Sequence, residues 1–380
     1  MKNLIPKTRC FSSTWVIGFG LLLTVQCSVL SAAGQLSTAS DSSLFYDSHF
    51  HLTNYIQEGI DLPRFLEIMG TKVGRSTLFG IPLQQDWSYQ NSGTYAPTYY
   101  LQSDAPLYYY SFTDAYIAMQ YKSLSLEQQK RFDPMITGFN PADMYAWKHI
   151  RRVLQTFPGV FSGIGEFSIH KEFVSSKVAG ESASLTNPAL DSILDFAGKV
   201  GLVVIIHNDM DMPFAKKGAD PVYLNQMKDL LRRHPSTTII WAHVGLGRVV
   251  HPVQYGGTGS SDLNTSQLEI VENILTDPTL KHVYFDISWD EVAKYVIATP
   301  QSLRNTISVI NRFPDRFLFG TDVVAPPDQP FYLAIYYMYQ PLWNGLNQDA
   351  SEKLRKGNYE RIFDEARVKV RAWEQANAKK

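Results

Sequence analysis

The stretch Leu202-Val-Val-Ile-Ile-His207 is an apolar run that ends in histidine, and Thr237-Thr-Ile-Ile-Trp-Ala-His243 repeats the plan further along the chain. Short, continuous apolar runs are typical of strands that are buried on both faces, as in a parallel sheet. An amphipathic helical pattern over Pro221–His234 lies between the two runs. The segment therefore predicts a strand–helix–strand unit.

The same alternation extends over most of the chain, and helical patterns such as Ala142–Thr156 and Pro188–Val200 separate most of the runs. The predicted strands are Leu44–Asp47, Ser76–Ile81, Pro134–Phe139, Val160–Glu166, Leu202–His207, Thr237–His243, His282–Ile287 and Arg316–Gly320. Eight strands with intervening helices favour an α/β fold of the TIM-type (β/α)8 barrel kind, which needs ~250 residues or more. A doubly wound open sheet is the alternative, and strand counting does not exclude it.

Two segments stand outside this repeat. Residues 84–122 follow the second predicted strand and are rich in tyrosine. A loop after a barrel strand lies on the face where active sites form, so this insertion is either a lid or substrate wall, or a long loop stabilised by aromatic packing. Residues 350–380 predict a C-terminal helical segment that closes the fold. We expect residues 34–380 to form a single barrel domain.

The N-terminus has the composition of an export signal. Lys2, Lys7 and Arg9 precede an apolar run over residues 15–25, which leads to Ser31-Ala32-Ala33. This succession predicts a signal peptide over residues 1–33 that is cleaved after about Ala33, and hence a periplasmic or secreted protein. The apolar run is shorter than the ~20 residues that a membrane span needs, so we expect no span after cleavage.

The net charge and the positions of the cysteines limit which partners and which metal ligands are expected. Removing Lys2, Lys7 and Arg9 from the 35 basic residues leaves 32 against 36 acidic residues, a net charge of −4. With no basic run in the mature part, nucleic acid is not favoured as a partner, and a small-molecule substrate is expected. Both cysteines, Cys10 and Cys27, fall in the predicted signal. Histidine, aspartate and glutamate are therefore left for metal chemistry.

The first predicted strand carries a pair of histidines in Tyr46-Asp47-Ser48-His49-Phe50-His51. Positions two apart in a strand point to the same face, so His49 and His51 would present two imidazoles to one point. Neutral imidazole nitrogen is a good ligand for zinc and similar divalent ions. A lone H-x-H pair is weak evidence, because two histidines at a strand end are often only polar surface.

Four later runs also end in a group that can bind a metal. Two of them end in His207 and His243, Phe161-Ser-Gly-Ile-Gly-Glu166 ends in glutamate, and Phe317-Leu-Phe-Gly-Thr-Asp322 ends in aspartate. Any one such residue often caps a helix or hydrogen-bonds a loop. Because the carboxyl ends of barrel strands meet on one face, the whole set predicts a metal site.

This order of residues resembles the amidohydrolase superfamily, and the amidohydrolase-related group called amidohydrolase family 2 looks closest. The tail from Glu352 to Phe363 is similar to the G-N-x-x-R-[IL]-F ending of that group, and the likeness covers roughly residues 44–363. The resemblance implies one or two divalent ions, with zinc as the preferred metal. The ligands that it implies are His49, His51, Glu166, His207, His243 and Asp322.

One residue departs from the family 2 pattern. Decarboxylases of that group commonly lack a metal-binding acid on the fourth strand, whereas Gly163-Ile-Gly-Glu166 resembles the fourth strand of TatD-type deoxyribonucleases. The likeness implies that Glu166 binds or bridges metal. Its alternative role is to orient a histidine ligand.

The ligand set implies a mechanism. A divalent ion with an open position lowers the pKa of bound water, and Asp322 would accept the water's proton and pass it to the leaving group. His243 would ligate the metal or polarise the substrate carbonyl. Arg248 would hold a substrate carboxylate or phosphate, or else anchor a loop through an ion pair. For Asp209, Asp211, Asp286 and Glu291 we expect supporting or solvated roles.

The leading functional hypothesis is hydrolysis of an amide, ester, lactone or similar bond in a small molecule. The first alternative is a metal-dependent decarboxylase of an aromatic or unsaturated acid, which uses most of the same ligands. The second alternative is a TatD-like phosphodiesterase or nuclease, and the excess of acidic over basic residues argues against it. A non-catalytic binding module is disfavoured, because such a module has no reason to keep six candidate ligands.

Overall fold

Each of the eight predicted strands overlaps a strand of one parallel sheet in the computed structural model. The structure describes residues 45–180, 182–212, 221–248 and 267–377, so the predicted signal peptide lies outside the described residues. Within these ranges an eight-stranded sheet runs in the order β1-β3-β6-β7-β8-β9-β10-β11, and each neighbouring pair is parallel. Its strands are β1 (Phe45–Asp47), β3 (Val73–Leu78), β6 (Phe132–Ile136), β7 (Gly163–Ser168), β8 (Val203–His207), β9 (Ile239–Trp241), β10 (Val283–Asp286) and β11 (Phe317–Leu318).

The first and last strands meet and close the sheet into a barrel. Ser48 N donates to Phe319 O at 3.0 Å, just beyond β1 and β11. Further along, β2 (Phe50–His51) pairs in parallel with β12 (Val323–Val324). The TIM-type barrel is therefore confirmed, and the open doubly wound sheet is wrong.

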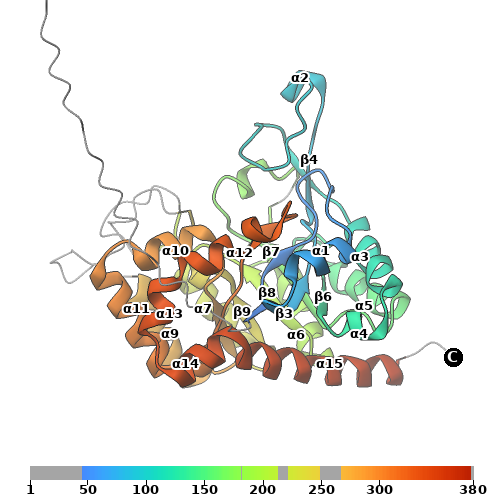
Figure 1. Cartoon of the computed structure of the whole chain (residues 1–380). Helices are drawn as coiled ribbons and strands as arrows, with labels where there is room; N and C mark the ends of the chain where they lie inside the picture. The colour runs from blue at the N-terminus through green and yellow to red at the C-terminus, as the bar shows by residue number, and fades with distance from the viewer. Residues whose placement is uncertain (1–44, 181, 213–220, 249–266, 378–380) are drawn as a thin grey trace, which may run out of the picture. The chain divides into compact units, whose positions relative to one another are not determined.

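Helices follow the strands on the outside of the barrel (Figure 1). Their apolar faces cover the strand residues that point outward, such as Val204 and Ile206, whereas Val203 and Ile205 point into the barrel. The helices of this layer and of the C-terminal region are α1 (Leu62–Met69), α3 (Phe112–Ser123), α4 (Leu126–Gln129), α5 (Ala146–Thr156), α6 (Pro188–Val200), α7 (Leu224–Arg233), α9 (Gln267–Thr276), α10 (Asp290–Ile297), α11 (Pro300–Arg312), α12 (Gln329–Met338), α13 (Gln340–Gly345), α14 (Gln348–Glu352) and α15 (Asn358–Ala376).

Helix α15 packs against side chains that point into the barrel. This packing gives a structural role to the G-N-x-x-R-[IL]-F ending noted in the sequence. Tyr359 and Phe363 are buried in the same cluster as the inward-pointing residues Val203 and Ile205. Asn358 donates hydrogen bonds to Pro314 O and Phe317 O, which holds the helix against β11. The C-terminal segment thus closes the end of the barrel opposite the strand ends that carry the candidate site.

Several boundaries differ from the predicted ones. Helix α5 begins at Ala146 rather than Ala142, because the side chains of Asn140 and Asp143 accept hydrogen bonds from nearby backbone N–H groups and form turns there. The predicted strand Thr237–His243 ends at Trp241, because the chain turns over Ala242–Gly245, where His243 and Val244 have left-handed φ values.

The insertion after β3 has secondary structure of its own. It contains an antiparallel pair of β4 (Leu83–Gln85) and β5 (Leu107–Tyr109) with the short helix α2 (Tyr89–Ser92) between them. In Figure 1 this part projects from the barrel beyond the ends of β3 and β7. None of the helices in the described ranges has the length and hydropathy of a membrane span.

Candidate metal centre

The histidine pair and the last aspartate meet where the barrel closes. His49 lies between β1 and β2 and His51 ends β2, while Asp322 lies between β11 and β12. Asp322 Oδ1 is 3.2 Å from His49 Nε2 and 3.1 Å from His51 Nε2. The Asp322 backbone N–H donates to His49 O at 2.8 Å, so the same hydrogen bonds that close the barrel bring these three side chains together.

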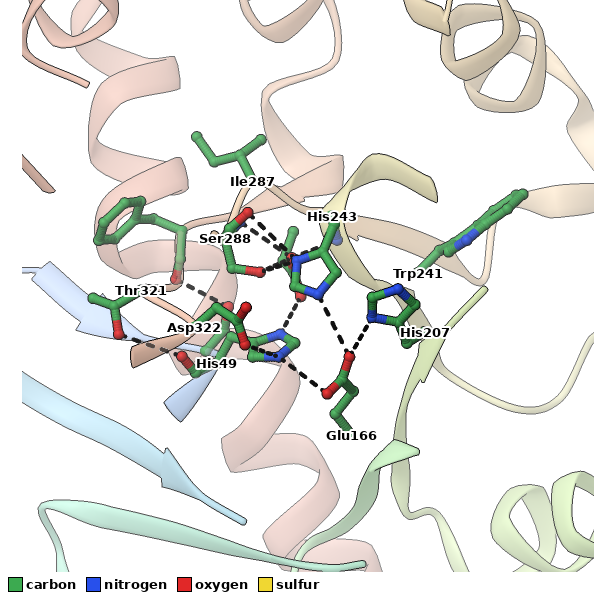
Figure 2. Close-up of polar contacts among 12 residues, drawn as sticks. His49, Glu166, His207, Trp241, His243, Ile287, Ser288, Thr321 and Asp322 are labelled. Carbon is green, nitrogen blue, oxygen red and sulfur yellow. Dashed lines mark hydrogen bonds and ion pairs between the residues drawn. The ribbon is translucent and has the colours of Figure 1, made fainter. Parts of the chain in front are cut away.

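Glu166 of β7 connects this trio to the two other histidines. Its Oε2 lies 3.3 Å from His51 Nε2 and 3.8 Å from His49 Nε2. Its Oε1 faces the opposite way, 2.5 Å from His207 Nδ1 and 3.4 Å from His243 Nε2. Figure 2 shows Glu166 facing His49, His207 and His243. One carboxylate therefore has an oxygen directed at each of two histidine pairs.

Hydrogen bonds on the far side of the rings fix three of the imidazoles. His49 Nδ1 lies 3.0 Å from Asp286 Oδ2, and His207 Nε2 lies 3.0 Å from Asp209 Oδ1. His243 Nδ1 lies 2.9 Å from the Ser288 hydroxyl (Figure 2). Partners of this kind set the tautomer and direction of a metal-binding histidine. The supporting role expected of Asp286 and Asp209 agrees with these contacts.

The backbone is held in unusual conformations at this site. His243 and Asp322 have left-handed φ values of 57° and 54°, which residues other than glycine seldom adopt. Such strain persists where surrounding structure enforces it, and it is concentrated at functional sites. Gly320 is required here for space, since a Cβ atom at that position would lie 2.5 Å from His49 Cβ.

Charge interactions oppose the effect of burial in this cluster. Burial alone raises the pKa of Glu166, but Lys171 and His207 outweigh it and hold that pKa well below its ordinary value. Burial likewise raises the pKa of Asp322, and His49 and His51 reverse the effect. Both acids are therefore ionised at neutral pH. Burial lowers the pKa of His243, which keeps its imidazole neutral and able to bind a metal.

The donor set fits a divalent cation. The groups whose ligand atoms all lie within 4.8 Å of one another include His49, His51, Glu166 and Asp322 in one and Glu166, His207 and His243 in another. His49 Nε2 and His243 Nε2 are buried and have no hydrogen-bond partner among the described residues. Without a bound cation, the neighbouring carboxylates Asp286 and Asp322 raise the pKa of His49 against the effect of burial, and Glu166 and Asp209 raise that of His207 to about 9. Imidazole nitrogens and ionised carboxylates that converge in this way match the ligand preference of zinc and related ions. The structure thus brings together all six residues that the sequence singled out as ligands.

Arg248 lies among glutamate and tyrosine side chains and not with the predicted metal ligands. Its guanidinium lies 3.0 Å from Glu291 Oε1 and 3.5 Å from Glu172 Oε1. It also donates to the hydroxyls of Tyr99 and Tyr100 in the insertion. Of the two roles that the sequence left open, these contacts favour the anchoring of a loop.

Two residues near the metal centre were not predicted from the sequence. Lys171 lies in the loop after β7 with Nζ 3.8 Å from Glu166 Oε1. Trp289 follows β10, and its ring lies 5.1 Å from that of His243. Neither continues a strand-end pattern, so only their proximity in the sequence to Glu166 and Asp286 hinted at a place near the site.

The insertion is tied to the loop that carries Lys171. Lys177 Nζ donates to Tyr100 O at 2.6 Å and to Ser103 O at 2.7 Å. Tyr100 is buried in an aromatic cluster with Tyr55 and Tyr99, and its hydroxyl donates to Glu172 Oε1 at 2.9 Å. Tyr89 of α2, by contrast, is 81% exposed. Aromatic packing therefore stabilises the base of the insertion, close to the centre.

A closed parallel barrel with a buried histidine and carboxylate cluster at its strand ends defines an enzyme of the metal-dependent hydrolase type. The family model described as amidohydrolase matches residues 46–364. The chain belongs to the amidohydrolase family. A search of curated proteins finds no match.

Solved structures with TM-scores of 0.50 or more show the same fold at low sequence identity. An amidohydrolase from Burkholderia multivorans with bound zinc is 12% identical with a TM-score of 0.52, over 85% of this chain and 99% of that one. A 2,6-dihydroxybenzoate decarboxylase in complex with 2,6-dihydroxybenzoate is 12% identical with a TM-score of 0.50, over the same shares. A putative 2-pyrone-4,6-dicarboxylic acid hydrolase from Pseudomonas putida is 12% identical with a TM-score of 0.48, over 85% and 98%.

Proposed function

We propose that this enzyme hydrolyses an amide, ester, lactone or similar bond in a small molecule, with a divalent ion held by His49, His51, Glu166 and Asp322. The observation that carries the proposal is the position of Asp322, whose Oδ1 contacts both histidines. Its side chain is 12% exposed, more than those of the other candidate ligands, so it is the one that water and substrate reach.

The bound ion supplies a Lewis acid and a water molecule of lowered pKa. Asp322 is ionised, so it accepts the proton of the attacking water and later donates it to the leaving group. His243 is neutral and held through Nδ1 by Ser288, which leaves Nε2 directed at the reaction centre. From there it binds the ion or polarises the substrate carbonyl.

Zinc is the proposed metal, because the donor set is rich in imidazole and carboxylate. The zinc bound by the structurally similar B. multivorans amidohydrolase supports this choice. A second ion is proposed between Glu166 Oε1, His207 and His243, since the two oxygens of Glu166 face different histidine pairs. Glu166 would then contribute one carboxylate oxygen to each of the two sites.

The test is a substrate screen on protein of measured metal content, with amides, esters and lactones next to aromatic acids and phosphodiesters. A hit is repeated in water enriched in ¹⁸O. Hydrolysis places one labelled oxygen atom in the product. Release of carbon dioxide with no labelled oxygen in the remaining organic product would instead make the enzyme a decarboxylase, and turnover of phosphodiesters alone would make it a phosphodiesterase.

A further inference from the structure

A cavity of about 370 Å³ lies between helix α5, the end of the insertion and the loop after β6. Tyr109 and Ser111 of the insertion line one side of it, and the first turns of α5 line the other. Small-molecule sites in proteins have volumes of about 300–1,000 Å³. The described residues that line this cavity include none of the six candidate metal ligands, so the cavity is separate from the metal centre.

Two exposed cations of α5 line this cavity. Lys148 and Arg152 are four residues apart, so one helical turn brings them to the same side of α5. In the part of the chain that the structure describes, neither side chain forms an ion pair with a carboxylate. Their charges are therefore available to an anionic ligand.

Two acids lie near the cavity, and both have other partners. Asp143 Oδ1 accepts a hydrogen bond from Tyr145 N at 2.8 Å. Asp114 is buried, and its Oδ1 accepts from Gly138 N at 3.0 Å. Asp114 Oδ2 also faces His149, whose Nε2 is 3.6 Å away. His149 therefore offsets the buried acid, and Lys148 and Arg152 determine the charge that a ligand meets.

An aromatic ring lies beside the two cations. Tyr145 lines the cavity and is 64% exposed, and Lys148 Nζ lies 4.5 Å from the centre of its ring. An exposed tyrosine ring offers a face on which a flat ring can stack. Ser111 and Asn140 add a hydroxyl and an amide to the lining. The cavity thus combines positive charge, one flat apolar surface and polar groups.

We propose that this cavity is a second, non-catalytic binding site for a small molecule that carries both a phosphate group and a flat ring, as a nucleoside monophosphate does. Lys148 and Arg152 bind the phosphate, and the planar guanidinium of Arg152 can donate two parallel hydrogen bonds to it. The ring stacks on Tyr145. A ligand in this position touches both the insertion and α5, and it binds whatever reaction the metal centre performs.

Three probes separate the contributions of the ring and the phosphate in calorimetry on metal-loaded protein at neutral pH. Adenosine monophosphate has both groups, adenosine has only the ring, and ribose 5-phosphate has only the phosphate. We expect adenosine to bind at least about tenfold more weakly than the monophosphate, because the ionic hydrogen bonds are lost. Ribose 5-phosphate should bind about five- to tenfold more weakly, because stacking is lost.

The variants remove one contribution each. Lys148→Gln combined with Arg152→Gln should weaken binding of the monophosphate by about tenfold to a hundredfold and leave adenosine within about twofold. Tyr145→Ala should reduce the affinity for the monophosphate to that for ribose 5-phosphate. All three side chains are exposed, so the fold should be retained. Arg304→Gln combined with Lys369→Gln removes the same charge from exposed positions on α11 and α15 and should bind as the wild type does.

Three results would overturn the proposal. One is a wild-type protein that binds none of the probes. Another is unchanged binding of the monophosphate by the Lys148 and Arg152 double variant, which would place the phosphate elsewhere, for example on the metal. The third is an equal loss in the control double variant, which would make the attraction one of overall charge. Equal binding of ribose 5-phosphate and the monophosphate would remove the ring from the proposed ligand.

Discussion

The metal centre and the tyrosine-rich insertion lie next to each other but are built in different ways. Glu166 lies near the end of β7, and the other candidate ligands sit at or just beyond the end of a barrel strand. The hydrogen bonds that close the barrel hold His49 next to Asp322. The insertion is held by loop contacts, such as those from Lys177 to Tyr100 O and Ser103 O. The hydrogen bonds of the barrel therefore set the positions of the candidate ligands, whereas contacts between loops set the positions of the side chains around them.

The largest effect in this comparison is expected at Asp322. Asp322→Asn keeps the size and one oxygen ligand but cannot accept a proton. Turnover of a confirmed substrate should fall by ~10²–10⁴ while much of the metal is retained. Metal content and rate are measured on the same samples. Asp211→Asn, a change near the end of β8 that lies outside the cluster, is the control. Nearly full turnover of a metal-loaded Asp322→Asn protein would refute the mechanism.

The next effect is expected at Asp286, which contacts the centre only through His49 and His243. Its Oδ2 fixes His49 Nδ1, and its Oδ1 accepts a hydrogen bond from His243 N at 2.8 Å. Asp286→Asn should weaken metal affinity about 10- to 100-fold, the usual cost of losing a partner that orients a ligand. Competition with a chelating dye measures this. An unchanged affinity would mean that the ring of His49 is oriented by the barrel alone.

A smaller effect is expected where the insertion is anchored. Lys177→Met removes two hydrogen bonds from a charged donor to backbone carbonyls. We expect a loss of about 1–2 kcal/mol in the free energy of unfolding, because side-chain entropy offsets part of the interaction. Chemical denaturation gives this value, and metal content should not change. A loss of metal here would show that the two regions are not independent.

The smallest effect is expected at the tip of the insertion. Tyr89 on α2 is 81% exposed, whereas Tyr100 at the base is buried. Tyr89→Ser should therefore change stability by less than about 0.5 kcal/mol. Chemical denaturation of Tyr89→Ser is compared with that of Tyr100→Phe, which removes the hydrogen bond to Glu172 at the base of the insertion. Equal losses for the two variants would contradict this division.

The sequence predicted the barrel well because its strands are buried on both faces. All eight predicted strands overlap the eight that form the sheet, and α6 begins at Pro188 and ends at Val200 as expected. The candidate ligands could be found because the carboxyl ends of parallel strands in a closed barrel must converge. Their convergence is observed, and their role as ligands stays a prediction.

The surroundings of the centre could not be predicted in the same way. Lys171, Trp289 and the partners of Arg248 come from loops, and the positions of loops depend on contacts between distant parts of the chain. The turn that ends β9 before His243 also depends on such contacts, because Asp286 Oδ1 accepts the hydrogen bond from His243 N. Periodicity in the sequence carries no information on these interactions.

The most direct test of the account is the metal content of protein purified without chelator, measured per chain by mass spectrometry. Wild-type protein should carry at least one equivalent of a divalent ion, with zinc predominant. His51→Ala should lose most of it, whereas His149→Ala, which changes a histidine on α5 outside the cluster, should retain it. Wild-type protein without bound metal, or equal loss in both variants, would contradict the proposed metal centre.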